Sequence, residues 1–279
     1  MEITNLTKKR LAEYLDKGKR FDQREPFEYR NISIELGTSN NAEGSARVKI
    51  GETEIMAGVK MSIGVPYTDS PNAGVLVTTA EFSPMASDKF EPGPPAIESI
   101  ELARIVDRGI RESEFIDFEK LCIKEGELVW MINLDIYPLN DAGNLIDACA
   151  LAAVAAMSQA VFPKMENDKV VFGELTSKKL PLSEKMPLTM TFYKIGKHML
   201  VDPITEEEEA SDARLTLAIS TDKKEDFINA LQKGGDHPMS VEEINTLIDT
   251  SFKIYKKCCK RITFSEFARS SKVSTMHQR

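Results

Sequence analysis

Residues 128–157, LVWMINLDIYPLNDAGNLIDACALAAVAAM, decide the expected fold because two different apolar periods follow one another. The first period is two, which predicts a long strand ending at Pro138. Its apolar positions are Leu128, Trp130, Ile132, Leu134 and Ile136. The polar segment LNDAGN then turns the chain, and residues 145–160 are apolar at almost every position of a helix. A helix that is apolar nearly all round is expected to lie buried between other elements.

Shorter periodic segments precede this region. Near-helical spacing predicts a helix over residues 4–17, and alternation predicts an antiparallel meander between residues 31 and 61. A further strand is expected within residues 74–82. A loop rich in Pro, Gly, Ser and charge, residues 83–95, leads into a helix predicted over residues 96–114. Four isoleucines are among the apolar positions of that helix: Ile97, Ile100, Ile105 and Ile110.

Strands and helices continue after the buried helix. Strands are predicted at residues 169–175 and 213–221, and a hairpin that turns near Gly196 is predicted at residues 187–202. A long helix is expected over residues 241–268. Blocks of strands and helices joined by hairpin signals predict an α+β fold in two halves of similar size.

The same pattern suggests boundaries along the chain. We expect an N-terminal helical extension at residues 1–25, a first half at about 26–165 and a second half at about 166–267. Residues 268–279 form a short polar tail. Identity between the two halves is too weak to identify a sequence repeat.

Composition narrows the function. The 279 residues carry a formal net charge of −8, whereas a protein that binds nucleic acid with its whole surface is normally basic. A role with RNA or DNA therefore requires a local basic patch or a basic partner.

The chain has no apolar run long enough to span a bilayer, and its N-terminus does not have the pattern of a signal peptide. We therefore expect a cytoplasmic protein without a membrane partner. Four cysteines without a CxxC pair, and three histidines, do not predict a zinc site.

The helix SIELARIVDRGIRES carries a row of arginines. Arg104, Arg108 and Arg111 lie at positions i, i+4 and i+7, so the three guanidinium groups share one face. A guanidinium group suits bidentate contact with phosphate. Acidic neighbours in the same helix leave a second interpretation open, that of a solvated face held by ion pairs. The absence of arginine between Arg47 and Arg104 makes this row a local concentration of the kind that the net charge requires.

The turn before the buried helix is a second candidate. A glycine turn that opens a helix presents backbone N–H groups and the positive end of the helix dipole, which together can hold a phosphate. Here Gly143 is followed by Asn144 and Leu145, so no cation stands at the mouth of the helix, and Asp141 would repel an anion. Asn144 can equally serve as the N-cap of the helix.

A third candidate is VDPITEEEEASDARLTLAIS, residues 201–220. Four consecutive glutamates, Glu206 to Glu209, suggest either the acidic residues of an enzyme or a solvated turn in which water reaches every carboxylate. Two-metal chemistry needs carboxylates that converge from separate elements. The sequence does not show such convergence and leaves open whether Mg²⁺ binds this turn.

Together these segments resemble the RNase PH-like family of phosphorolytic 3′-to-5′ exoribonucleases. The resemblance covers roughly residues 18–265 and runs through GKRFDQREPFEYRNISIELG, AEGSARVKIGETEIMAGVKM, the arginine helix, VWMINLDIYPLNDAGNLIDACALAAVAAM and LVDPITEEE. It implies the RNase PH-like fold, which is related to domain 2 of ribosomal protein S5. That fold has two pseudo-symmetric α/β halves, with helices packed together and sheets outside.

The departures from the family pattern concern the catalytic positions. Active members carry Gly-Thr-Arg or Gly-Ser-Arg at the helix mouth, where the hydroxyl and the guanidinium hold the attacking phosphate, but this chain has Gly143-Asn144-Leu145. Asp202 matches the first family carboxylate, the second position is Glu208, and a further family aspartate aligns with Arg214. The carboxylate run therefore resembles a degenerate site without catalytic residues, bound metal or cofactor.

The arginine helix combined with VDPITEEEE most resembles the non-catalytic RNase PH-like subunit type of the archaeal exosome core. That resemblance implies pairing with a catalytic RNase PH-like subunit, and three such heterodimers closing into a hexameric ring. It also implies RNA-binding cap subunits and single-stranded RNA as partners. Arg104, Arg108 and Arg111, or at least the first two, are then expected to contact RNA phosphates beside the active centre of the partner.

Two other functions are compatible with the residues. One is a self-sufficient phosphorolytic exonuclease in which Glu208 replaces the family aspartate and another cation replaces the one that is missing. The other is a scaffold that never contacts nucleic acid. Release of nucleoside diphosphates by the chain alone would favour the enzyme, and crosslinking of RNA near Arg104 would exclude the scaffold.

Overall fold

The computed structural model describes residues 4–222 and 225–261 and contains two main sheets. The first sheet has the strand order β1-β2-β3-β6-β4, with β5 paired to β6, and every pairing is antiparallel except that of β4 with β6. The strands of this sheet are β1 (Ile32–Leu36), β2 (Gly44–Ile50), β3 (Thr53–Gly64), β4 (Val75–Ala80), β5 (Cys122–Lys124) and β6 (Leu128–Asn140). The helices in the same part of the chain are α2 (Ile97–Arg111), the 3₁₀ turn η1 (Glu119–Leu121) and α3 (Leu145–Gln159).

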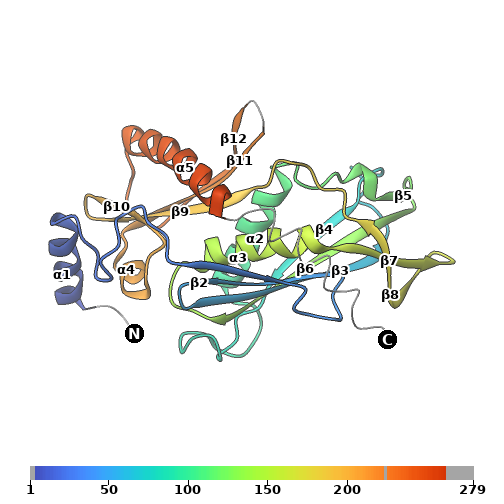
Figure 1. Ribbon diagram of the computed structural model, residues 1–279, viewed down its shortest axis with the longest axis horizontal. Coiled ribbons are helices and arrows are strands. Elements are labelled where there is room, and N and C mark those ends of the chain that lie inside the picture. The colour runs from blue at the N-terminus through green and yellow to red at the C-terminus, as the bar shows by residue number, and fades with distance from the viewer. Residues whose placement is uncertain (1–3, 223–224, 262–279) are drawn as a thin grey trace.

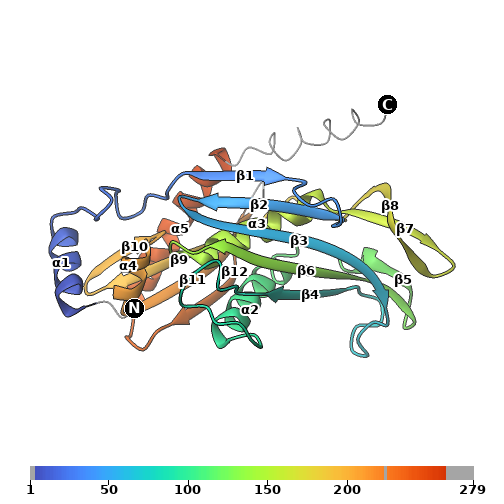
Figure 2. The ribbon, with the colours of Figure 1, turned by 90° about the horizontal axis from the view of Figure 1, so that it is seen from below.

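The second sheet is fully antiparallel, with the order β10-β9-β11-β12. A separate hairpin, β7-β8, projects from the end of the molecule opposite to α1 (Figures 1 and 2). The remaining elements are α1 (Asn5–Asp16), β7 (Val161–Glu166), β8 (Lys169–Lys179), β9 (Leu188–Ile195), β10 (His198–Val201), α4 (Thr205–Ala210), β11 (Ala213–Thr221), β12 (Asp226–Gly234) and α5 (Val241–Arg261).

Helices α2 and α3 lie between the two sheets, as Figure 1 shows. Side chains of β9 alternate between two layers of helix. Thr191 faces α3 and donates its hydroxyl to Asp147 at 2.8 Å, whereas Lys194 faces the other side and pairs with Glu243 of α5 at 2.7 Å. The interior layer agrees with the implied fold, and α5 adds a layer on the outer face of the second sheet.

The predicted burial of α3 is confirmed. Every residue from Ile146 to Met157 is buried, because one side of the helix packs on β2 and β3 and the other on β9. The long strand β6 also follows the predicted alternation, and it extends to Asn140. Its side chains on one face belong to the same core as α3.

Several features differ from the predictions. Strands β5, β7 and β12 were not expected, since they are short or their alternation is interrupted by charge or by small residues. Ile97 is 82% exposed and Ile100 is 49% exposed, because both share the outward face of α2 with Arg104, while Ile105 and Ile110 point to the core. Two further predictions stay untested, since the helix beyond Arg261 and the polar tail at residues 268–279 lie outside the described residues.

The N-terminal helix α1 is fastened to the second half. Leu11 and Leu15 are buried in a small apolar cluster with Tyr193, Leu200 and Ala210, which belong to β9, β10 and α4. This cluster is separate from the main core and explains why a helix at the start of the chain lies beside the carboxylate run.

Close packing between β2 and the end of α3 generates a prediction. A Cβ atom added to Gly44 would lie 2.4 Å from the carbonyl oxygen of Ala156 and 2.7 Å from the Cα atom of Ala160. Backbone atoms cannot move aside cheaply, so Gly44→Ala should lower the free energy of unfolding by about 2–3 kcal/mol in denaturant titrations.

Gly58 on the adjoining strand provides the matched control. Its added Cβ would meet no atom nearer than the Cβ of Ala42 at 3.8 Å. Gly58→Ala should therefore leave the stability within about 1 kcal/mol of wild type, with any gain arising from the unfolded chain. Equal losses for the two variants would contradict the packing account.

Candidate functional site

The mouth of α3 is built around a close approach of two backbone segments. Gly143 has φ +88°, and a Cβ atom there would lie 2.5 Å from the carbonyl oxygen of Pro203. Asn144, the N-cap residue, also has positive φ, and its side chain does not cap the helix. Glycine is required at position 143 both by the backbone angle and by the lack of space. The turn that precedes α4 is thereby held against the start of α3.

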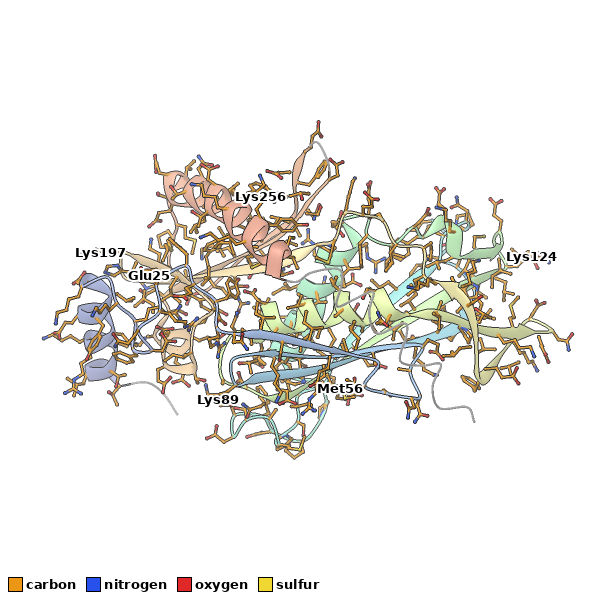
Figure 3. All side chains as sticks on the ribbon, viewed as in Figure 1. Glu25, Met56, Lys89, Lys124, Lys197 and Lys256 are labelled. Atoms are coloured by element: carbon orange, nitrogen blue, oxygen red, sulfur yellow. The ribbon has the colours of Figure 1, made fainter. Side chains whose placement is uncertain are left out.

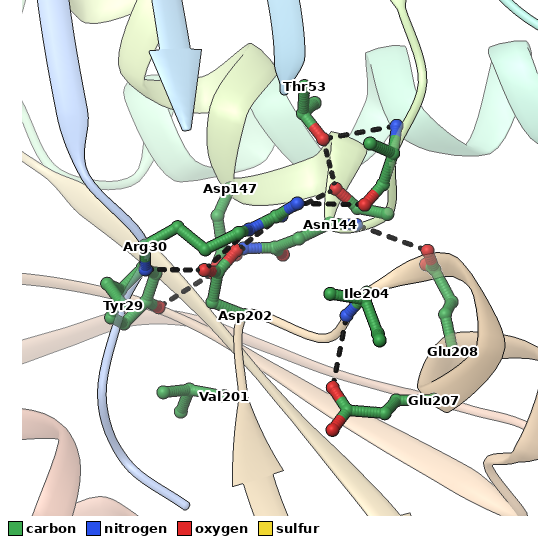
Figure 4. A network of polar contacts seen from close by, with 12 residues as sticks. Tyr29, Arg30, Thr53, Asn144, Asp147, Val201, Asp202, Ile204, Glu207 and Glu208 are labelled. Carbon is green, nitrogen blue, oxygen red and sulfur yellow. Dashed lines mark hydrogen bonds and ion pairs between the residues drawn. The ribbon is translucent and has the colours of Figure 1, made fainter. Parts of the chain in front are cut away.

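The N–H groups at this mouth are bonded to groups of the chain itself. Gly143 N–H donates to Asp141 Oδ1 at 3.0 Å, and Asn144 N–H donates to Glu208 Oε2 at 3.1 Å. Ala142 N–H is bonded to the hydroxyl of Thr53 at 3.2 Å. Figure 4 shows Glu208 reaching the start of α3 from α4. An internal carboxylate thus bonds to an N–H group that could otherwise contact a phosphate oxygen.

Asp202 is the charged centre of the site. It is fully buried and forms ion pairs with Arg30 at 2.7 Å and Arg24 at 2.8 Å. It also accepts a hydrogen bond from the side-chain amide of Asn144 at 2.9 Å. Arg30 also donates to the carbonyl oxygens of Ala142 and Gly143 at 2.8 and 3.0 Å. The basic residues near the helix mouth therefore neutralise a carboxylate of the chain and bind its backbone (Figure 4).

The carboxylate run is a short helix, α4, and the interpretation of it as a solvated turn is wrong for Glu207 and Glu208, which are bonded to groups of the chain itself. Glu207 is fully buried and forms an ion pair with Arg20, which is also fully buried. Arg20 further donates to the carbonyl oxygens of Val201 and Asp202 at 2.9 and 2.8 Å. Glu206, by contrast, is exposed. Because helical geometry points successive side chains in different directions, like charges that are adjacent in sequence are separated in space.

Two further carboxyl groups lie close to the mouth of α3. Burial raises the pKa of Asp147 to about 6, although the hydroxyls of Tyr29 and Thr191 donate to it at 2.7 and 2.8 Å. Burial likewise raises the pKa of Glu208, which accepts the hydroxyl of Tyr193 at 2.7 Å. Both carboxyl groups are held by donors of the chain, so they help to lock the two halves together.

The three arginines of α2 have different environments. Arg111 pairs with Asp107 at 3.0 Å, donates to the carbonyl oxygen of Leu76 and lies over the ring of Phe118. Arg104 and Arg108 are exposed, and neither forms an ion pair with a residue in the described part of the chain. Of the acidic neighbours of these arginines, Asp107 pairs with Arg111, Glu101 and Glu114 pair with cations outside α2, and Glu112 forms no ion pair within the described chain. Glu101 pairs with Arg214 and Glu114 with Lys185, so the solvated-face interpretation applies to Arg111 alone.

Sequence reasoning missed the cations that neutralise the site, namely Arg20, Arg24 and Arg30. They lie within one N-terminal segment, but spacing along that segment could not reveal partners that are more than 170 residues away. It also missed Asp147, which appears in the sequence only as one charged residue within an apolar helix.

Within residues 4–222 and 225–261, no group of three or more His, Cys, Asp or Glu side chains is placed to hold a metal ion. In the same part of the chain no helix has the length and apolar character to span a membrane.

The buried pair of α4 can be tested by neutralising one residue at a time. Glu207→Gln leaves the Arg20 guanidinium buried without a counter-charge, so the free energy of unfolding should fall by about 3–5 kcal/mol. Glu206→Gln, one residue earlier in the same helix, should change it by less than about 0.5 kcal/mol. Chemical denaturation of the two variants measures both values, and similar results for both would contradict the assignment.

The raised pKa of Asp147 predicts how stability depends on pH. Because the folded carboxyl binds its proton more tightly than the unfolded one, its contribution is complete below about pH 4 and is lost as pH rises through about 6. The loss should be on the order of 3 kcal/mol. Comparing unfolding free energies of wild type and Asp147→Asn from pH 4 to 7 isolates this contribution. Parallel curves for the two proteins would show that the group is not perturbed.

Comparison with known proteins places this geometry in a family. Residues 28–163 match the family model described as 3′ exoribonuclease family, domain 1, and residues 185–254 match that for domain 2. The "Exosome complex component Rrp42" of Methanothermobacter thermautotrophicus is 44% identical over 244 residues, which are 87% of this chain and 89% of that protein. The protein of the same name from Pyrococcus horikoshii is 42% identical over 90% of this chain and 91% of its own length.

Solved structures agree. A chain of the Archaeoglobus fulgidus exosome with RNA bound to the active site superimposes with a TM-score of 0.83 at 39% identity, covering 93% of this chain and 98% of that chain. A chain of an archaeal exosome core gives a TM-score of 0.79 at 37% identity, with coverage of 92% and 96%. Both halves of the fold thus have counterparts at nearly full length. The chain belongs to the 3′ exoribonuclease family described by the RNase PH models and carries both of its domains.

Proposed function

We propose that this chain is a non-catalytic subunit of an archaeal exosome, a ring-shaped complex that degrades RNA from the 3′ end. One observation carries the proposal: relatives named as an exosome component match the chain at 40–44% identity along almost its whole length. The structural counterpart with RNA bound to an exosome active site supports a role close to RNA.

The arrangement at the mouth of α3 supports the non-catalytic part. In phosphorolysis the attacking group is inorganic phosphate, which needs free donors and a cation. Here Asp141 and Glu208 accept the N–H groups of Gly143 and Asn144, and Arg30 is bonded to Asp202. A phosphate ion would have to displace a carboxylate that is held on its other oxygen by Tyr193. This argues against the alternative of a self-sufficient exonuclease.

In this function, α2 contacts the RNA through its exposed arginines. Arg104 and Arg108 project from an exposed face without an acidic partner in the described chain, so their charge remains free for phosphate oxygens. Arg111 contributes less, since its guanidinium is bonded to Asp107 and Leu76. An acidic subunit can in this way offer a local basic patch without binding nucleic acid over its whole surface.

The partners follow from the same proposal. A catalytic RNase PH-like subunit supplies the chemistry, and three heterodimers close into a hexameric ring. RNA-binding cap subunits and single-stranded RNA complete the assembly. The absence of a bound cofactor or metal in this subunit and a location in the cytoplasm stay predictions of the sequence.

Assembly and RNA contact can be tested together. Complex reconstituted from the chain and its catalytic partner should degrade labelled RNA with phosphate, whereas the chain alone should release no nucleoside diphosphate. In that complex, Arg104→Ala combined with Arg108→Ala should lower RNA affinity about tenfold or more. The slope of log affinity against log salt should become shallower by about 1.4, which is 0.7 for each lost phosphate contact with a single strand.

A matched control exists on α5. Lys253 and Lys257 are also exposed cations at positions i and i+4 of a helix, so replacing both by alanine removes the same charge elsewhere. This control should leave affinity and salt slope near those of wild type. If both double variants lost RNA affinity equally, the effect of the arginines would be one of net charge alone. If neither lost affinity, RNA contact through α2 would be ruled out.

A further inference from the structure

A pocket of about 690 Å³ lies beside the first turn of α2. Its wall is the loop at residues 82–96, in which the rings of Phe82 and Phe90 lie 4.5 Å apart. Three prolines of the same loop add further apolar surface: Pro92, Pro94 and Pro95. The rings and prolines form an apolar lining, in which the two aromatic side chains pack on each other and each proline has a fixed φ.

The charges around this pocket are mainly negative. Glu81, Glu91 and Glu98 line it, and the one cation among its lining residues, Lys89, forms an ion pair with Glu209 of α4. Lys89 is labelled in Figure 3, at the edge of the molecule below the first sheet. Glu91 and Glu98 are exposed and form no ion pair with another described residue. An RNA phosphate would therefore be repelled here, whereas a cationic side chain would be attracted.

The first turns of α2 add an apolar surface next to the pocket. Ile97 is 82% exposed and Ile100 is 49% exposed, and helical spacing places both on the same face as Arg104. Large apolar side chains that share an exposed face with charged neighbours are typical of protein interfaces. The apolar turn and the arginines are about 10 Å apart at 1.5 Å per residue, so one helix carries two surfaces of different chemistry.

We propose that the pocket and the first turn of α2 form a docking surface for a basic segment of the catalytic partner subunit. The segment carries an arginine or lysine that enters the pocket between the glutamates and the rings of Phe82 and Phe90, and apolar side chains that cover Ile97 and Ile100. A guanidinium suits such a lining because it stacks on aromatic faces while it pairs with carboxylates. This inference rests on the proposed function as a subunit and adds the surface that holds it.

Docking at this position has a consequence for the arginine face. The start of α2 becomes fixed against protein, while Arg104 and Arg108, two to three turns further along the helix, lie at the rim of the contact. The acidic pocket thus directs the orientation of the subunit, and the arginines remain available to RNA beside the partner.

Charge reversal tests the pocket. Binding of the purified catalytic RNase PH-like subunit is measured by calorimetry for wild type and for Glu91→Lys combined with Glu98→Lys. Repulsion of the basic segment should weaken binding by at least about tenfold, and the difference should shrink at high salt. Glu119→Lys combined with Glu125→Lys is the control, because both glutamates are exposed and they flank in sequence Lys124, which Figure 3 shows at the other end of the molecule. It should bind within about threefold of wild type.

A second variant tests the apolar part without altering charge. Ile97→Ser combined with Ile100→Ser should weaken binding about tenfold and leave the thermal unfolding of the free chain unchanged, since both side chains are exposed. If wild type binds the catalytic subunit and the pocket variant binds equally well, the docking surface is wrong while the subunit role stands. If wild type does not bind, the proposed function itself fails. Greater RNA affinity of the pocket variant than of the Glu119→Lys/Glu125→Lys control, without weaker subunit binding, would assign the pocket to nucleic acid and overturn the inference.

Discussion

The buried carboxylate of Asp202 is the interaction on which the arrangement depends. Arg24 and Arg30 approach it from the N-terminal segment, Asn144 approaches it from the start of α3, and its own backbone belongs to the second half. A carboxylate removed from water is costly unless it is paired and hydrogen-bonded, so three separate segments must meet correctly for the fold to be stable. The pair of Arg20 and Glu207 repeats this constraint beside it, since Arg20 also donates to the backbone carbonyl oxygen of Asp202.

These ion pairs also bear on phosphate binding at the mouth of α3. The residues that could present cations and N–H groups to a phosphate at the mouth of α3 are bonded to acidic residues of the same chain. Glu208 bridges from α4 to the N–H of Asn144, and Tyr193 holds its other oxygen. Charge compensation that stabilises the junction between the two halves thereby occupies N–H groups and a guanidinium at the mouth of α3 that a phosphate would need.

Helix α2 combines the two surfaces through which such a subunit could act. Its inward face packs between the sheets, its first turns expose isoleucines beside an acidic pocket, and its later turns expose Arg104 and Arg108. A rigid helix keeps these surfaces at a constant separation, so a contact with protein at one end sets the position of the arginines at the other.

Alternation in β6, the apolar run of α3 and the spacing of the α2 arginines were readable from the chain alone, because strand and helix periods are local properties. The residues Gly143-Asn144-Leu145 likewise showed that the turn itself supplies no cation, although folding brings Arg30 to the helix mouth. The burial of Glu207, the exposure of Ile97 and the partners of Arg20, Arg24 and Arg30 were not readable, since each depends on residues distant in sequence. The four adjacent glutamates, Glu206 to Glu209, cannot be distinguished in the sequence. Folding places one of them against a buried guanidinium and leaves another in water, because α4 is a helix packed on one side only.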